Sequence, residues 1–362
     1  MASGSTSSAA ADTMQACFYA KFGGPEVDQV GEVPRPKAQD LAEGQVYGFD
    51  FCGKVVASKS TEWVAGDEVF GMCKGLRRGG LAEFFIVDGD ICVRRPPNMP
   101  SFDAAGLPLV GITVLKAFSK CRLLPAAQRS SSQKAPRILV LGGAGGVGTV
   151  AIQLAKGYYG ASFVATTASA GEKSDLVREL GADRVVNYRD EKFWQVLASS
   201  SQDDLFDAIL DCTGEAAKCP SLLRDGGGLV SIAASPTVAA LREFIEESDT
   251  RSFHKITFGV DGFLHSTFGG FIFDRLTGAA SLESKCRKRG GGTFAHIIGT
   301  GHREYVEILA AEYNAGRLRT VIDHVYPLRD GIQAIERIES GRAKGKVIIS
   351  IADEEASTTT AI

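Results

Sequence analysis

The chain has 362 residues, of which 44% are hydrophobic and 23% are charged, a composition typical of a globular protein with length for two domains. Its formal net charge of -3 provides no basic field for nucleic acid or for an anionic membrane surface, so neither is expected as a partner. Eight cysteines occur without a Cys-x-x-Cys pair, which argues against a disulfide framework and favours a reducing compartment.

Two segments have compositions that bear on targeting and on membrane insertion. Residues 1–13 are rich in Ser and Ala but have no Arg and no amphipathic pattern, so we expect a short disordered tail. Cytosol is then the default location, with a plastid or a mitochondrion left open. The apolar stretch 256–280 contains several charged residues, which favours a buried segment or an oligomer contact, such as a homodimer interface, over a bilayer span.

The first third of the chain alternates short β-type runs with Gly- and Pro-bearing loops, which predicts a mainly β domain. The clearest runs are 54–57, 67–70 and 82–87. Near Pro100 the pattern changes to a helix with one apolar face, and the polar stretch 126–136 is expected to be a surface loop. The apolar residues of that helix are Leu107, Val110, Val114, Leu115 and Phe118.

From Arg137 to about Gly299, strands and helices alternate, as in a parallel, doubly wound α/β sheet. The predicted strands are 138–141, 163–166, 184–186 and 207–211. After His302 the pattern predicts a helix to Tyr313, an extended stretch at 320–322, a helix over about 331–340 and a strand over 346–351. The acidic, Thr-rich end, 352–362, is expected to be frayed.

The strongest motif is a glycine-rich turn between the strand 138–141 and a helix with one apolar face. Gly143, Gly145 and Gly148 satisfy G-x-G-x-x-G in this strand–turn–helix context. One glycine permits the tight turn, one lets the backbone approach a pyrophosphate, and one lets the helix pack against the strand. The helix N-terminus directs amide donors at the anion. A glycine-rich turn without function is the alternative, disfavoured because both flanking elements agree.

The type of dinucleotide depends on the end of the second strand, where an NAD site usually has a carboxylate for the ribose 2′-hydroxyl. Residues 166–173 read TTASAGEK, and the only acid, Glu172, lies beyond the strand and next to Lys173. A hydroxyl and an ammonium suit a 2′-phosphate, so NADPH is predicted. The alternative for Lys173 is a solvated lysine, although cations are disfavoured at a helix start.

These motifs resemble the zinc-independent quinone oxidoreductase branch of the medium-chain dehydrogenase/reductase superfamily. The resemblance is carried by ILVLGGAGGVGTVAIQLAKGYYGAS and LVRELGADRVVNYRDE, and it continues through YGFDFCGKVV, AAGLPLVGITVLKAF and GRAKGKVII to cover most of residues 14–351. Within the branch, the chain is most similar to chloroplast-type quinone-enone oxidoreductases or alkenal reductases, and to reticulon-4-interacting-protein-like members.

The resemblance implies a GroES-like, mainly β domain joined to a Rossmann domain, with NADPH and substrate between them. The implied bounds are 14–119 for the GroES-like part, 120–300 for the Rossmann domain, and 301–351 for a C-terminal segment that returns to the β domain. The implied pyrophosphate-binding residues are Gly145, Gly146, Val147 and Gly148. Those for the adenosine 2′-phosphate are Ser169, Lys173 and Tyr188, and Thr113 would lie near the nicotinamide. Tyr188 could equally be a packed aromatic.

The sequence predicts no metal site. Zinc alcohol dehydrogenases of this superfamily carry a G-H-E motif and a cysteine-rich lobe, and the matching motif here is Gly48-Phe49-Asp50. Phe49 cannot ligate zinc and Cys52 has no histidine nearby in the sequence, so a tetrahedral site lacks its ligands. The histidines, expected at the surface or in packing, are His254, His265, His296, His302 and His324.

Without a metal, hydride transfer to a quinone or to the β-carbon of an enone depends on orientation in an apolar cleft, and the sequence identifies no general acid. One stretch departs from the relatives: Val46 is followed directly by Tyr47, where they have several dozen further residues that help wall the substrate cleft. A splice form or an error in the gene model would also produce this sequence. Two functions therefore remain: a working NADPH-dependent reductase of quinones or enones, and a catalytically weak NADPH-binding protein that acts through partner contacts.

Overall fold

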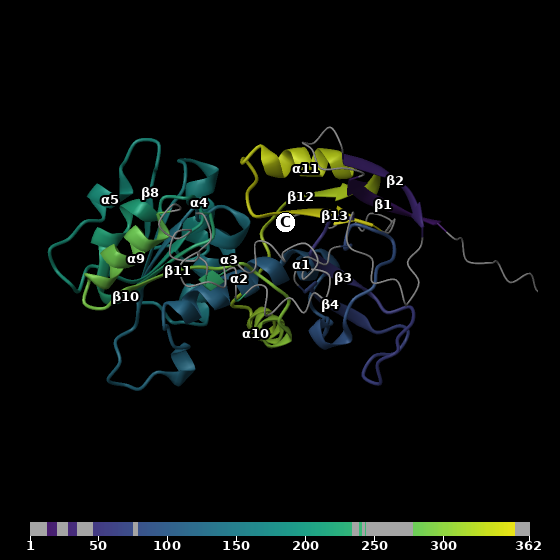
Figure 1. Ribbon diagram of the computed structural model, residues 1–362, viewed down its shortest axis with the longest axis horizontal. Coiled ribbons are helices and arrows are strands. Elements are labelled where there is room, and N and C mark those ends of the chain that lie inside the picture. The colour runs from purple at the N-terminus through teal and green to yellow at the C-terminus, as the bar shows by residue number, and fades with distance from the viewer. Residues whose placement is uncertain are drawn as a thin grey trace, which may run out of the picture.

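The computed structural model describes residues 13–19, 28–34, 46–74, 79–233, 239–240, 243 and 278–351. Figure 1 shows two lobes side by side, one around a large parallel sheet and the other around several short sheets. The first lobe is built from the middle of the chain. The second combines the N-terminal third with the last described elements, which return to it.

The large sheet has six parallel strands in the order β11-β10-β9-β6-β7-β8. This is the doubly wound order, in which the chain first builds outward on one side and then crosses to the other. The strands are β6 (Arg137–Leu141), β7 (Phe163–Thr167), β8 (Arg184–Val186), β9 (Phe206–Asp211), β10 (Leu223–Ser231) and β11 (Thr293–His296). The predicted doubly wound sheet is confirmed, and its switch point lies between β6 and β9.

Strand β6 is apolar throughout because helices cover both faces of the sheet. Ile138 and Val140 join a hydrophobic cluster with α2 (Pro108–Lys120) and α3 (Gly146–Gly157). Leu139 and Leu141 join a second cluster that includes Phe193 of α5 (Phe193–Val196) and residues of α9 (Ala279–Arg287). The helix α4 (Glu172–Glu179) connects β7 to β8.

In the part of the chain that the structure describes, the second lobe contains three small sheets. Strands β1 (Thr13–Tyr19) and β2 (Asp28–Pro34) form an antiparallel pair, and β3 (Asp50–Lys54), β4 (Glu68–Met72) and β5 (Val93–Arg94) form an antiparallel sheet. Strands β12 (Ile322–Pro327) and β13 (Lys346–Ser350) pair in parallel. The helices of this lobe and of the region between the lobes are α1 (Ser101–Gly106), α10 (Arg303–Asn314) and α11 (Gly331–Glu339). Short 3-10 turns occur along the described chain at 89–91, 126–128, 216–218, 220–222 and 328–330.

Two predicted strands of this lobe are wrong. Strand β3 ends at Lys54. The Val55 N–H still donates to the Asp67 carbonyl at 2.9 Å, but Val56 lies in the loop that follows and is 61% exposed. Residues 82–87 form no strand beyond a single bridge at Ala82. Their aromatic side chains still pack inward, and the ring of Phe85 lies 5.1 Å from that of Phe51 in an edge-on contact. Apolar β-type residues there satisfy packing without a backbone ladder. The stretch predicted at 320–322 is shifted, since β12 begins at Ile322.

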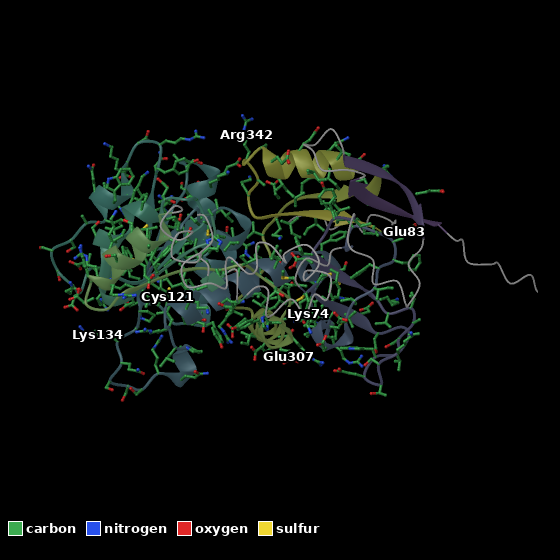
Figure 2. All side chains as sticks on the ribbon, in the orientation of Figure 1. Lys74, Glu83, Cys121, Lys134, Glu307 and Arg342 are labelled. Atoms are coloured by element: carbon green, nitrogen blue, oxygen red, sulfur yellow. The ribbon has the colours of Figure 1, made fainter. Side chains whose placement is uncertain are left out.

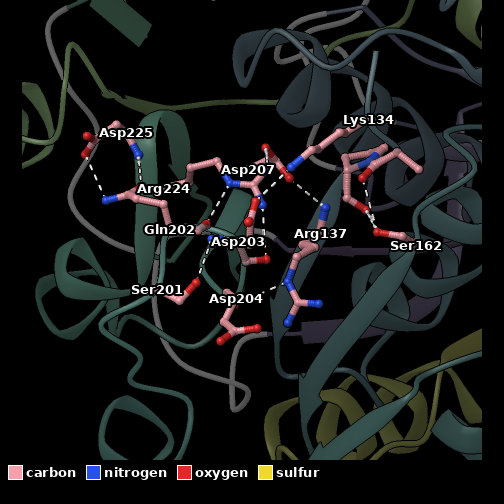
Figure 3. Close-up of polar contacts among 12 residues, drawn as sticks. Lys134, Arg137, Ser162, Ser201, Gln202, Asp203, Asp204, Asp207, Arg224 and Asp225 are labelled. Carbon is pink, nitrogen blue, oxygen red and sulfur yellow. Dashed lines mark hydrogen bonds and ion pairs between the residues drawn. The ribbon is translucent and has the colours of Figure 1, made fainter. Parts of the chain in front are cut away.

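A polar network joins the starts of three neighbouring strands of the large sheet (Figure 3). Asp207 of β9 accepts a hydrogen bond from the backbone N–H of Arg137 at 2.7 Å. It also forms an ion pair with Arg224 of β10 at 2.6 Å. The guanidinium of Arg137 also lies 4.1 Å from the centroid of the Phe163 ring on β7. These contacts hold the amino ends of the strands together, so the opposite, carboxyl edge is the one left for a ligand.

Some predictions fall outside the described residues, or are tested only in part. Residues 256–277 are not described, so the expected role of the apolar stretch stays a prediction. Among the residues that are described, no helix combines the length and the apolar character needed to cross a membrane. The cysteines with described side chains are all free thiols.

Candidate nucleotide-binding site

The glycine-rich turn lies at the carboxyl end of β6, at the switch point of the sheet. Gly142 has a φ of 83°, in the left-handed region that favours glycine. Its N–H donates to Thr167 Oγ1 at 2.8 Å, and the Gly143 N–H donates to the Thr167 carbonyl at 3.0 Å. The tight bend therefore belongs to Gly142, just before the G-x-G-x-x-G motif, and β7 holds the turn in place.

The predicted phosphate-binding residues lie together on the first turn of α3. A Cβ on Gly148 would lie 2.2 Å from the Gly142 carbonyl oxygen, so the helix can pack this closely only with glycine there. A Cβ on Gly145, by contrast, would have no neighbour nearer than 3.5 Å. Gly145 is the N-cap and has no side chain, and the amides of Gly146 and Val147 have no acceptor within the helix. The turn thus presents bare amide donors, which suit a phosphate.

The three residues predicted for the 2′-phosphate lie at one corner of the sheet. Strands β7 and β8 are neighbours with Thr167 opposite Val186, and the Ala168 N–H donates to the Val186 carbonyl at 3.1 Å. Ser169 follows the end of β7, Tyr188 follows the end of β8, and Lys173 is the second residue of α4. Tyr188 is 52% exposed, which rules out the packed-aromatic alternative.

Glu172, the only acid within residues 166–173, is paired with Lys344. Lys344 Nζ lies 2.6 Å from its carboxylate, and this hydrogen bond holds the pKa of Glu172 below its usual value. Lys344 belongs to the segment between α11 and β13, and Figure 2 shows its neighbour Arg342 projecting outward from the same segment. Sequence reasoning did not find this contact, because the two residues are 172 positions apart.

Thr113, predicted to lie near the nicotinamide, is buried in the middle of α2. Its hydroxyl donates to the Leu109 carbonyl at 2.7 Å. A Cβ on Gly299 would lie 3.3 Å from Thr113 Oγ1, so the backbone after β11 passes directly over this side chain. One turn earlier on α2, Val110 lies 3.5 Å from the corresponding Cβ position at Gly146. Helix α2 therefore touches the glycine-rich turn and extends from it towards Thr113.

A carboxylate and an ammonium that sequence reasoning missed lie beside this turn. Asp50, the first residue of β3, has Oδ2 at 3.4 Å from Nζ of Lys346, the first residue of β13. Asp50 Oδ1 also accepts the Leu109 N–H at 2.7 Å, and the two side chains are only 13% and 18% exposed. Burial raises the pKa of Asp50, and the positive charge of Lys346 opposes that rise. Asp50, the last residue of the Gly48-Phe49-Asp50 motif, is thus the counterion of Lys346.

The histidines do not gather into a metal centre in the part of the chain that is described, where no group of three or more His, Cys, Asp and Glu side chains is placed to hold an ion. His324 packs on Tyr326 with ring centroids 4.4 Å apart, in line with its predicted packing role. His296 is buried at the end of β11, its Nδ1 has no hydrogen-bond partner, and burial lowers its pKa. His254 and His265 lie outside the described residues.

A cavity of about 1450 Å³ lies in the second lobe. Its lining is mainly apolar and includes residues of β3, α1, α11 and β13. Among its aromatic residues are Tyr47, Phe51, Trp63, Phe85 and Phe102. Asp50, Leu109 and Lys346 also line it, and because Lys346 lies against Gly146, the cavity adjoins the glycine-rich turn. This lobe contains the Val46–Tyr47 junction, and Tyr47 lines the cavity.

Comparisons with known proteins agree with this geometry. A family described as zinc-binding dehydrogenase matches residues 180–349. The chain is 34% identical to the tomato (Solanum lycopersicum) 2-methylene-furan-3-one reductase over 266 residues, covering 70% of this chain and 64% of that protein. It is 35% identical to the chloroplastic NADPH-dependent alkenal/one oxidoreductase of Arabidopsis thaliana over 214 residues, covering 57% and 51%. The quinone oxidoreductase of Coxiella burnetii has a similar structure, with a TM-score of 0.70 at 21% identity, covering 94% of this chain and all of that one.

These findings confirm the family resemblance and the fold. The relatives by sequence are the enone and alkenal reductases that the motifs indicated, and the structural likeness confirms a doubly wound sheet with a second, smaller lobe. The chain spans between about half and two thirds of the length of these two relatives. The matched family segment begins at residue 180, after the Gly48-Phe49-Asp50 motif, so the absence of zinc stays a prediction.

Proposed function

We propose that this chain, a relative of the enone and alkenal reductases with the medium-chain dehydrogenase/reductase fold, is an NADPH-dependent reductase of quinones or α,β-unsaturated carbonyls. The observation that carries the proposal is the bare amide turn at the switch point of the sheet, with Gly145 open to a ligand and Gly148 closed against the strand. Ligands of doubly wound sheets bind at this position. The relatives' printed activities then suggest which dinucleotide chemistry the turn serves.

NADPH is the proposed cofactor, in preference to NADH. Ser169, Lys173 and Tyr188 offer two hydroxyls and an ammonium at the corner where the adenosine ribose would lie, and these groups suit a phosphate. Glu172 is engaged by Lys344, so its carboxylate is screened from this corner. An NAD site would instead use a free carboxylate for the 2′-hydroxyl.

When bound, NADPH would supply the hydride. The chain would contribute position and environment: the amides of Gly146 and Val147 hold the diphosphate, and Thr113 packs near the reacting end. The apolar lining of the cavity would favour an apolar acceptor. We propose no metal and assign no proton donor. We propose residues 14–119 as the GroES-like part, 120–300 as the Rossmann domain and 301–351 as the C-terminal segment that returns to the β domain. We also propose that the chain forms a homodimer and, by default, that it is located in the cytosol.

The test is cofactor oxidation by the purified protein against a small panel of acceptors, namely an ortho-quinone, a long-chain vinyl ketone and a 2-alkenal, with NADH in place of NADPH as the control. Saturable turnover with NADPH is the expected result, and the preferred acceptor identifies the substrate class. NADPH binding without turnover of any acceptor would contradict the enzymatic proposal.

That second outcome would support a non-catalytic NADPH-binding protein acting through partner contacts. The family resemblance favours this candidate, because it implies that relatives have several dozen further residues where this chain joins Val46 to Tyr47, and Tyr47 lines the cavity. A substrate wall missing at this position would leave nucleotide binding intact and weaken turnover.

A further inference from the structure

The cavity of the second lobe has a size and a course that bear on which acceptors the chain takes. Building on the proposed function, we infer that this cavity is a subsite for a long apolar chain carried by the acceptor. The substrate class is thereby narrowed to enones or quinones with an alkyl substituent of about ten carbons or more.

The cavity runs along two strands that start at the same place. All five residues of β3 and all five of β13 line it. A strand that turned only one face to a cavity would contribute every second residue, so both strands border it with an edge. In the described part of the chain, each is the outermost strand of its sheet. Their first residues, Asp50 and Lys346, lie 3.4 Å apart, and Lys346 lies against Gly146, so the inner end of the cavity is at the glycine-rich turn.

The length of β3 sets the length of the chain that fits. Its five residues, at about 3.3 Å each, span about 17 Å, which equals roughly ten carbon–carbon bonds of about 1.5 Å. The cavity volume of about 1450 Å³ likewise exceeds the roughly 300–1,000 Å³ of a typical small-molecule site. A short alkenal would fill only the inner part, so the remaining space matches a longer substituent.

Apolar side chains line this course. Phe51 and Ile348 come from the two strands, and Ile335 comes from α11. Two large hydrophobic side chains that remain exposed, Val56 at 61% and Ile338 at 58%, also line the cavity. Val56 follows the outer end of β3. An alkyl chain would remove this apolar surface from water, which is favourable.

The inner end of the cavity reaches the place proposed for the nicotinamide. Leu109 of α2 lines the cavity. A Cβ on Gly299 would lie 3.1 Å from Leu109 Cδ1 and 3.3 Å from Thr113 Oγ1, so these two side chains are neighbours on one face of α2. An acceptor with its alkyl chain along β3 would therefore present its carbonyl end to the side chain that the proposed function places near the reacting end of NADPH.

The first experiment measures binding without turnover. The ligands are saturated 2-alkanones of about 5 to about 15 carbons, which lack the conjugated double bond, and the signal is the fluorescence of the full chain, since Trp63 lines the cavity. We expect the Kd to fall by about twofold for each added methylene up to about ten carbons, and then to level off. Full burial would give about fourfold for each methylene, and the exposed edge at Gly53 and Lys54 reduces this effect.

Variants locate the alkyl chain within the cavity. A Cβ on Gly53 would have no neighbour within 4 Å, so the fold accommodates Gly53→Phe and the ring enters the open space beside β3. This variant should weaken the long ketones by about tenfold and leave the short ones unchanged, because it blocks the outer part of the cavity. Val56→Asp should weaken only the longest ketones, since it places a carboxylate beside the end of the chain. Val64→Asp is the matched control, because Val64 is 62% exposed and is not among the lining residues.

The second experiment measures turnover with NADPH on two series of acceptors, 1-alken-3-ones and alkyl benzoquinones of the same chain lengths. The kcat/KM should rise with chain length in the series that is reduced, and the preferred series identifies the head group. Gly53→Phe should lower kcat/KM for the long acceptors only.

Three results overturn the inference: a Kd and a kcat/KM that do not depend on chain length, an equal loss of short and long ketones in Gly53→Phe, or a Val64→Asp variant that behaves like Val56→Asp. The two experiments also separate this inference from the proposed function. Binding that depends on chain length, without reduction of any acceptor, refutes the proposed function and leaves the cavity as an alkyl-binding site. Reduction of short and long acceptors with equal kcat/KM refutes the subsite alone.

Discussion

Two glycine-to-alanine substitutions in the same turn should have different effects. Gly148→Ala should mainly lower the stability of the fold, and Gly145→Ala should mainly weaken NADPH binding. In Gly148→Ala, the new Cβ would lie 2.2 Å from the Gly142 carbonyl oxygen and 2.6 Å from Gly143 Cα, so backbone atoms must move. Overpacking of this kind typically costs about 1–3 kcal/mol. In Gly145→Ala, the nearest atom is at 3.5 Å and the backbone is extended at a φ of -81°, so the folded state accepts the methyl group.

The assay is thermal unfolding together with NADPH binding. Gly148→Ala should lower the Tm by about 2–4 °C for each kcal/mol lost by a domain of this size. Gly145→Ala replaces the N-cap glycine of α3 by a poorer capping residue, which should lower the stability by at most about 1 kcal/mol and the Tm correspondingly little. This variant should nevertheless bind NADPH poorly, because the methyl group lies where the diphosphate must approach. Equal stability losses in the two variants, or full NADPH affinity in Gly145→Ala, would refute the reasoning.

Three other outcomes follow from single contacts. Lys173→Ala should weaken NADPH by about tenfold and NADH by much less, with Lys134→Ala on the far edge of the sheet as the matched control; equal losses for both cofactors would mean that Lys173 does not meet the 2′-phosphate. The hydrogen bond from Arg337 holds the pKa of Asp323 below its usual value, so the pair stabilises the fold above the unfolded pKa and loses this effect as the pH falls through the folded one. The Tm of Asp323→Asn should accordingly fall less than that of the wild type between about pH 4 and pH 2. Burial raises the pKa of Cys121 to about 12, so mass spectrometry should find it unalkylated at neutral pH in the native protein and alkylated after denaturation.

Local patterns predicted the sheet lobe well because each of its elements is specified by neighbouring residues. Strand β6 is a continuous apolar run since both of its faces are buried, and the glycine turn follows it directly. The second lobe was predicted less well. Residues 82–87 have the composition of a strand, but their aromatic side chains pack on β3 without forming a ladder, and whether a strand pairs depends on a partner elsewhere in the chain.

The sequence by itself determined the strand–turn–helix unit, its glycine-rich turn and the corner at which Ser169, Lys173 and Tyr188 lie, because these depend on short-range periodicity and on strands that follow one another. Only the tertiary structure decided which distant side chains reach that turn. Lys344 meets Glu172, and Lys346 meets Asp50 across 296 positions, because the last strands of the chain return to the second lobe, next to the large sheet. Contacts of that separation are set by how the whole chain folds back on itself, which no local pattern records.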